Sequence, residues 1–150
     1  MASGKGHLVG GVIFAWIFLA LLSNYFFVPT PTEIVIFVGL AVMFSLWPDV
    51  DIKSIGQKVF YTIFFITDAI LVFYFQDYKA AAFFGLLIIL PVLAKHRGWT
   101  HSKITAVLLP TPLLLVPMYV FEGTLAEGLP YYFAAVAGYF SHLFFDKKLI

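Results

Sequence analysis

The chain has 150 residues, of which 62% are hydrophobic, 19% aromatic and only 11% charged. Soluble globular domains carry about 25% charged residues, so this composition excludes an ordinary soluble domain and indicates a single integral-membrane domain over residues 1–150. The chain has no cysteine, which excludes disulfides and thiolate metal sites. We expect membrane lipids as its surroundings and no nucleic-acid partner.

Long apolar runs predict about six membrane-spanning helices, because one span needs about 20 apolar residues. The expected spans are 8–27, 32–48, 59–75, 79–95, 103–121 and 129–146. The fifth contains Pro110, Pro112 and Pro117, which predict a kinked or broken helix. The connections are short, as in antiparallel bundles. The predicted fold is therefore an all-α, polytopic membrane protein.

Short polar segments between these runs contain all four histidines. They hold His7, the pair Asp49 and Asp51, the stretch from His96 to Ser102, and His142 with Asp146. Counting the spans in order places every one of these segments on the side of residue 1. Independent placement would put four histidines on one side in about one case in eight, so the exclusion of polar groups from hydrocarbon explains the pattern weakly.

The basic residues follow the same division. Those expected on the side of residue 1 are Lys5, Lys53, Lys58, Lys95, Arg97, Lys103, Lys147 and Lys148, whereas Lys79 falls on the opposite side. Cytoplasmic loops of membrane proteins carry the excess of lysine and arginine. The histidine-bearing side is therefore expected to face the cytoplasm.

Two of the polar segments contain paired metal-binding side chains. His142 and Asp146 are four residues apart on a predicted helix, share one face and could bind one ion; the alternative is a polar helix end at the membrane surface. Asp49 and Asp51 repel each other unless a cation lies between them. The alternative for this pair is a solvated turn at the helix exit.

The segment from His96 to Ser102 adds two imidazoles and a fixed positive charge. Gly98 permits a tight turn that could direct His96 and His101 to a common point. Arg97 offers a planar guanidinium suited to phosphate. Either Thr100 or Ser102 could cap the fifth helix. The alternative is a basic loop that touches anionic lipid headgroups.

Together these segments predict a metal site. The candidate ligands are His7, Asp49, Asp51, His96, His101, His142 and Asp146. Imidazole and oxygen ligands favour zinc, with manganese and iron as alternatives, and seven ligands allow one or two ions. Such sites suit hydrolysis: Asp49 or Asp51 would orient the attacking water, and Arg97 would neutralise charge on a phosphoryl oxygen.

Asp68 lies near the middle of the third expected span, where an acid is a functional candidate by default. We favour a protonated or hydrogen-bonded carboxyl group that faces Thr62, Thr67 or a neighbouring helix. Its depth in the span makes it a poor metal ligand.

The order of these motifs resembles the YdjM-like family of inner-membrane metal-dependent hydrolases. The matching stretches are His7, Pro48-Asp49-Val50-Asp51, His96-Arg97-Gly98-Trp99-Thr100-His101-Ser102, and Gly138 through Ser141-His142 to Asp146. The resemblance covers essentially the whole chain. It implies a polytopic protein of the bacterial or archaeal inner membrane with metal-dependent hydrolytic activity.

The sequence thus predicts a membrane-bound hydrolase for a phosphoester of a lipid or other amphiphile, with its site facing the cytoplasm. One alternative is a transporter for divalent cations, which would need polar residues across the membrane. Another is a non-catalytic protein whose metal is structural, which would have a closed coordination shell.

Overall fold

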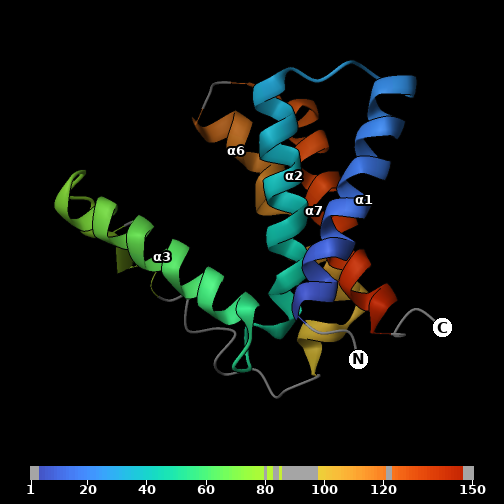
Figure 1. Ribbon diagram of the computed structural model, residues 1–150. Coiled ribbons are helices and arrows are strands. Elements are labelled where there is room, and N and C mark those ends of the chain that lie inside the picture. Colours follow the sequence, from blue (N-terminus) through green and yellow to red (C-terminus); the bar gives the residue numbers. More distant parts are fainter. Residues whose placement is uncertain (1–3, 80, 83–84, 86–97, 121–122, 147–150) are drawn as a thin grey trace.

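The structure is a bundle of helices that one further helix leaves at a wide angle (Figure 1). The computed structural model describes residues 4–79, 81–82, 85, 98–120 and 123–146. Its long helices are α1 (Gly4–Tyr25), α2 (Pro31–Leu46), α3 (Ile55–Phe73) and α7 (Leu125–Phe145). Its short elements are the 3₁₀ turns η1 (Trp47–Asp49) and η2 (Trp99–His101) and the helices α5 (Lys103–Leu108) and α6 (Pro112–Val120). These described ranges contain no strand, so the all-α fold is confirmed.

Three long helices form the centre of the bundle. The helices α1, α2 and α7 all pack against one another, and α6 packs against α7. Helix α3 diverges from the lower end of α2 (Figure 1). The start of α1, the turns η1 and η2, and the end of α7 lie at this same end, so segments far apart in the sequence meet there.

Within the described residues, three helical stretches are long and apolar enough to cross a membrane, namely Gly4–Tyr25, Pro31–Asp49 and Ile55–Phe73. Helix α7 has 21 residues, but it contains tyrosine, glycine and histidine residues and is not among these three candidate spans. The expected fifth span is broken, as its prolines predict, because α5 ends at Leu108 and α6 begins at Pro112. Most of the expected span 79–95 lies outside the described residues. The count of six spans therefore remains a prediction.

Side-chain caps fix where several helices begin. Thr30 and Glu33 form a capping box at the start of α2, in which the Thr30 N–H donates to Glu33 Oε2 at 2.7 Å. At the start of α5, Ser102 Oγ accepts a hydrogen bond from the Thr105 N–H at 3.0 Å. Ser102 is thus the cap of α5, one of the two residues expected for this role.

Two glycines allow the three central helices to approach closely. At Gly138 in α7, an added Cβ would collide with the backbone of Ala41 in α2. At Gly11 in α1, an added Cβ would lie 2.5 Å from Ser45 Oγ of α2. Both glycines therefore bring a helix into close contact with α2.

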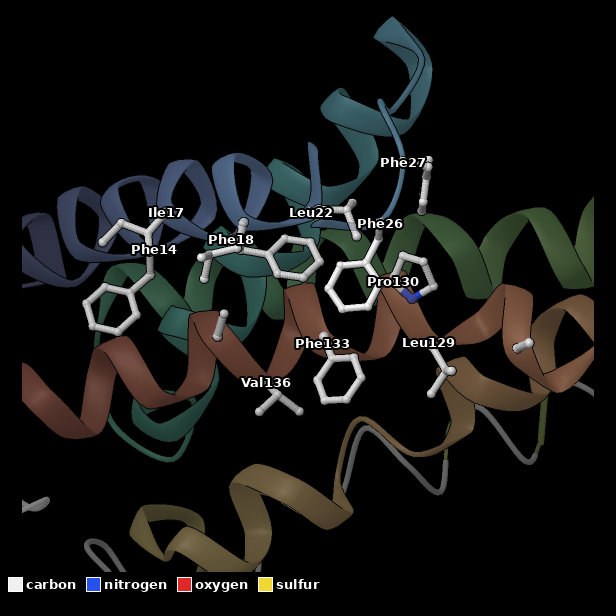
Figure 2. A pocket seen from close by; sticks show the side chains of 13 residues that line it. Phe14, Ile17, Phe18, Leu22, Phe26, Phe27, Leu129, Pro130, Phe133 and Val136 are labelled. Carbon is white, nitrogen blue, oxygen red and sulfur yellow. The ribbon is translucent and has the colours of Figure 1, made fainter. Parts of the chain in front are cut away.

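An apolar groove runs between α1 and α7 (Figure 2). Its volume is about 620 Å³, and aromatic and aliphatic side chains such as Phe14, Phe18, Phe133 and Val136 line it. Because α1 is a candidate membrane span, we expect this groove to lie at the depth of the lipid chains.

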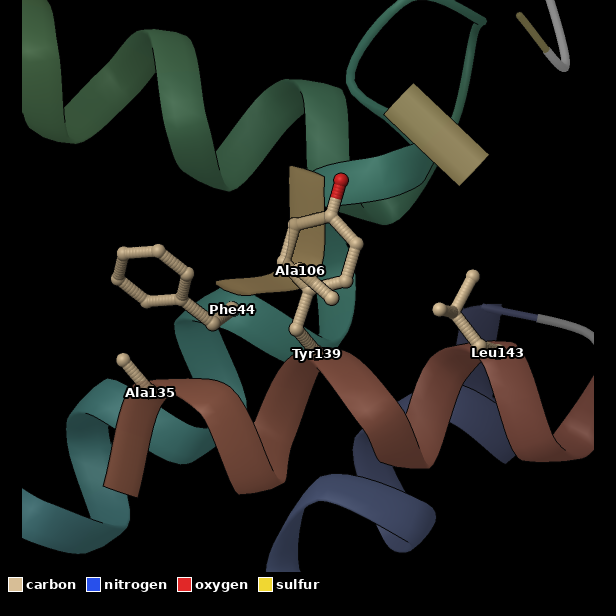
Figure 3. Packing of buried hydrophobic residues seen from close by; sticks show 5 residues of the cluster. All are labelled: Phe44, Ala106, Ala135, Tyr139 and Leu143. Carbon is tan, nitrogen blue, oxygen red and sulfur yellow. The ribbon is translucent and has the colours of Figure 1, made fainter. Parts of the chain in front are cut away.

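A compact apolar cluster joins α2, α5 and α7. It consists of Phe44, Ala106, Ala135, Tyr139 and Leu143, all buried (Figure 3). Burial of such side chains is the main source of stability in a packed core. The cluster fixes the short helix α5, and with it η2, against the end of α7.

Candidate metal centre

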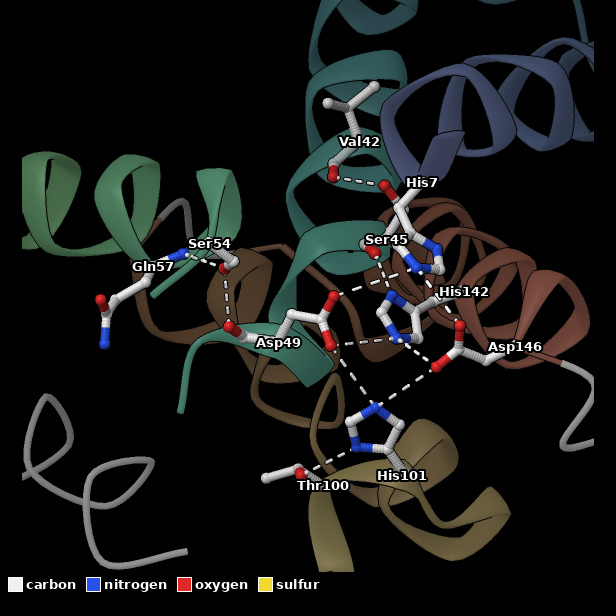
Figure 4. Close-up of polar contacts among 10 residues, drawn as sticks. All are labelled: His7, Val42, Ser45, Asp49, Ser54, Gln57, Thr100, His101, His142 and Asp146. Atoms are coloured by element: carbon white, nitrogen blue, oxygen red, sulfur yellow. Dashed lines mark hydrogen bonds and ion pairs between the residues drawn. The ribbon is translucent and has the colours of Figure 1, made fainter. Parts of the chain in front are cut away.

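Five of the predicted ligands converge at one end of the bundle (Figure 4). They come from four separate segments: the first turns of α1, the end of η1, the end of η2, and the end of α7. The residues are His7, Asp49, His101, His142 and Asp146. Their ligand atoms form two overlapping groups, each with all its members within 4.8 Å of one another, and His142 belongs to both.

The Nε2 atoms of all three histidines face both carboxylates. From Asp49, His101 Nε2 lies 3.5 Å away, His142 Nε2 3.6 Å and His7 Nε2 3.9 Å. From Asp146, the same three atoms lie 3.8, 3.8 and 3.5 Å away. These separations exceed those of good hydrogen bonds. Ligand atoms that share one tetrahedral zinc ion at 2.0–2.1 Å lie about 3.3–3.4 Å apart, so the shorter of these separations are close to those of atoms that bind a common ion.

The imidazole of His142 is held in one orientation by α2. Its Nδ1 atom lies 2.8 Å from the backbone carbonyl oxygen of Ser45. Because a carbonyl can only accept a hydrogen bond, Nδ1 carries the proton. In the neutral ring the lone pair is then on Nε2, which faces the carboxylates. Metal-binding histidines commonly have such a second partner, which fixes the tautomer and the ring direction.

The position of His101 depends on hydrogen bonds around η2. The Tyr139 hydroxyl of α7 donates to the Thr100 carbonyl, and Thr100 Oγ1 lies 3.2 Å from His101 Nδ1. Thr105 Oγ1 donates to the Trp99 carbonyl at 2.6 Å. These contacts tie the two residues that precede His101 to α7 and α5.

The centre is buried from most directions but opens beside Asp49. The side chains of His101 and His142 are 0% exposed, that of His7 1% and that of Asp146 3%, whereas Asp49 is 15% exposed. The rings of His7 and His142 stack with centroids 3.8 Å apart. A solvent-derived ligand would therefore reach the centre from the side of Asp49.

One predicted ligand among the described residues, Asp51, does not join these groups, although it follows Asp49 by two residues. Asp49 ends a 3₁₀ turn, and residues two apart near such a turn point in different directions. Asp68, on α3, is also absent, and its buried Oδ1 has no hydrogen-bond partner among the described residues. The predicted ligand His96 and the predicted phosphate-binding Arg97 lie outside the described residues.

Two supporting groups were missed by sequence reasoning. The carbonyl of Ser45 orients His142, but a backbone atom leaves no signal in the sequence. Tyr139 reads as an ordinary core aromatic residue. Its one signal is its position three residues before His142, on nearly the same face of α7.

Comparison with known protein families identifies the chain. The sequence profile described as YdjM inner membrane protein matches residues 1–147. The chain belongs to the YdjM family. The family resemblance predicted from the motifs is thus confirmed, and the YdjM protein is a protein of the inner membrane. No curated protein and no solved structure matches it.

Proposed function

We propose that this YdjM protein binds one divalent transition-metal ion, with zinc as the first choice, and hydrolyses a phosphoester of a lipid or amphiphile. The observation that carries the proposal is the convergence of three imidazole Nε2 atoms on two carboxylates. Neutral imidazole and carboxylate ligands without thiolate suit zinc, manganese or iron. When bound, such an ion would supply an activated water and stabilise charge on a phosphoryl oxygen.

The access to the centre favours catalysis over a purely structural metal. Structural zinc sites have closed shells, whereas catalytic sites keep a position open for water or substrate. A hollow of about 640 Å³ is lined by both Asp49 and Asp146. These two carboxylates therefore connect the proposed ion to a space that a substrate could enter.

The apolar groove supports a lipid-like substrate. It lies between α1 and α7, the helices that supply His7, His142 and the C-cap residue Asp146. A substrate whose polar group is at the centre could place its hydrocarbon chain along these helices. A soluble ester would use neither the groove nor a site at the end of a membrane bundle.

The apolar packing between the three central helices argues against a pathway for cations through the bundle. Beyond the centre, the contacts between α1, α2 and α7 are made by Leu19, Leu22, Phe37 and Ala134, all buried. Ions cross hydrophobic interiors only along polar groups. We place the centre on the cytoplasmic side because Lys5, Lys53, Lys58 and Lys103 fall at its end of the bundle by the helix order.

The test is hydrolysis by the purified full chain in detergent, loaded with zinc, manganese or iron in separate samples. We expect phosphate release from a lipid phosphoester by the wild type and none by His101→Ala. A soluble phosphoester and a peptide serve as comparison substrates. Cleavage of either one without cleavage of the lipid would show that the proposed substrate class is wrong.

A further inference from the structure

The hollow beside the metal centre has a basic wall that the proposed ligands leave unused. Asp49 and Asp146 line one part of it, and Lys53, Ser54 and Lys58 line another. These three residues belong to the connection between η1 and α3 and to the first turns of α3. The hollow thus joins carboxylates of the centre to two ammonium groups.

Ser54 fixes this wall relative to the centre. Its hydroxyl donates to the Asp49 carbonyl at 2.7 Å and accepts from the Gln57 N–H at 3.0 Å (Figure 4). One side chain therefore caps α3 and holds its N-terminus against the residue that supplies a ligand. The distance from the basic wall to the centre is accordingly set by the fold.

The wall carries positive charge that the described residues do not neutralise. Lys53 and Lys58 are exposed, and neither forms an ion pair with a carboxylate in the part of the chain that the structure describes. The N-terminus of the 19-residue α3 adds partial positive charge, and its first turn has no acidic residue. Three sources of positive potential therefore meet in one hollow.

With the proposed ion bound, the hollow would contain more positive than negative charge. Two carboxylates would cancel the charge of one dication, so the two ammonium groups would remain without a counter-charge. A ligand that completes the site would thus carry negative charge and lie between the ion and the lysines.

We propose that Lys53 and Lys58, with the N-terminus of α3, bind a phosphate group next to the metal centre. This inference rests on the proposed metal site and names the anion that it accepts. Lysine ammonium groups bind phosphate as point charges, and helix N-termini favour anions. The phosphate group belongs either to free phosphate or to a lipid headgroup, and the two sources share this chemistry.

The first test measures the binding of inorganic phosphate to the metal-loaded full chain by calorimetry. We expect the double variant Lys53→Ala/Lys58→Ala to bind at least about tenfold more weakly than the wild type. The double variant Lys53→Arg/Lys58→Arg keeps both charges and should retain most of the affinity. Lys79→Ala changes a lysine beyond the opposite end of α3 and should bind as the wild type does.

Metal content and thermal unfolding are measured for each variant, so that loss of fold is distinguished from loss of the anion site. Equal phosphate affinity of the wild type and the double alanine variant would overturn the proposal, as would the absence of phosphate binding by the metal-loaded wild type. Phosphate binding without any ester hydrolysis would contradict the proposed function but support the anion site.

The second arm uses vesicles of phosphatidylcholine with and without phosphatidic acid. If the lysines contribute to binding of a lipid phosphate at the centre, competition by phosphatidic acid should displace inorganic phosphate from the wild type. If the alanine variant lost only vesicle binding and kept its affinity for inorganic phosphate, the lysines would be surface contacts and the proposal would be wrong.

Discussion

The hydroxyl group of Tyr139 in α7 donates a hydrogen bond to the backbone carbonyl of Thr100, the residue before His101. This bond crosses 39 positions in the sequence and ties the turn η2 to the helix that carries His142. We expect Tyr139→Phe to weaken metal binding about tenfold, since groups that orient ligands typically affect affinity by tenfold or more. The stability loss should be only about 1 kcal/mol, and metal titration by calorimetry measures the first effect.

Tyr132→Phe is the matched control for this change. Its hydroxyl also donates to a backbone carbonyl, that of Val107 at 3.1 Å, but it does not contact η2. Metal affinity should therefore stay at the wild-type value. An equal loss in both variants would mean that the Tyr139 hydroxyl has no specific role in positioning His101.

The two neighbouring aspartates should behave differently. Asp49 faces His7, His101 and His142, whereas Asp51 belongs to neither group of ligand atoms. We expect Asp49→Asn to lower metal affinity by at least about tenfold, because it removes a charged ligand. Asp51→Asn should retain stoichiometric metal. If metal is lost from Asp51→Asn and kept by Asp49→Asn, the arrangement described here is incorrect.

The close contact between α7 and α2 should also be measurable. Gly138→Ala would place a methyl group against the Ala41 backbone, so we expect a loss of about 1–3 kcal/mol in the free energy of unfolding. Gly39→Ala, at a helical position with nothing within 4 Å of an added Cβ, should be neutral or stabilising by up to about 1 kcal/mol. Thermal unfolding in detergent compares the two, and equal midpoints would contradict the packing.

Much of the architecture follows from local sequence signals. The apolar runs predict α1, α2 and α3, and the prolines predict the break between α5 and α6. Counting spans also predicted that His7, His101 and His142 share one side, and the structure places them together. The side on which a segment lies depends only on how many spans precede it. This prediction therefore does not require knowledge of how the helices pack.

What the sequence could not predict depends on tertiary contacts. The direction of a side chain near a 3₁₀ turn separates Asp49 from Asp51, and the spacing of the two residues does not reveal it. The carbonyl of Ser45 is a backbone group that any residue would supply. The basic wall at Lys53 and Lys58 depends on where α3 begins, and that point lies four residues before the predicted start of the third span.

The most direct test of the central claim is the metal-to-protein ratio of the purified full chain, measured by elemental analysis after loading and removal of excess ion. The account predicts one transition-metal ion per chain in the wild type and its loss in His101→Ala and in His142→Ala. Absence of stoichiometric metal from the folded wild type, or full retention by both variants, would contradict it.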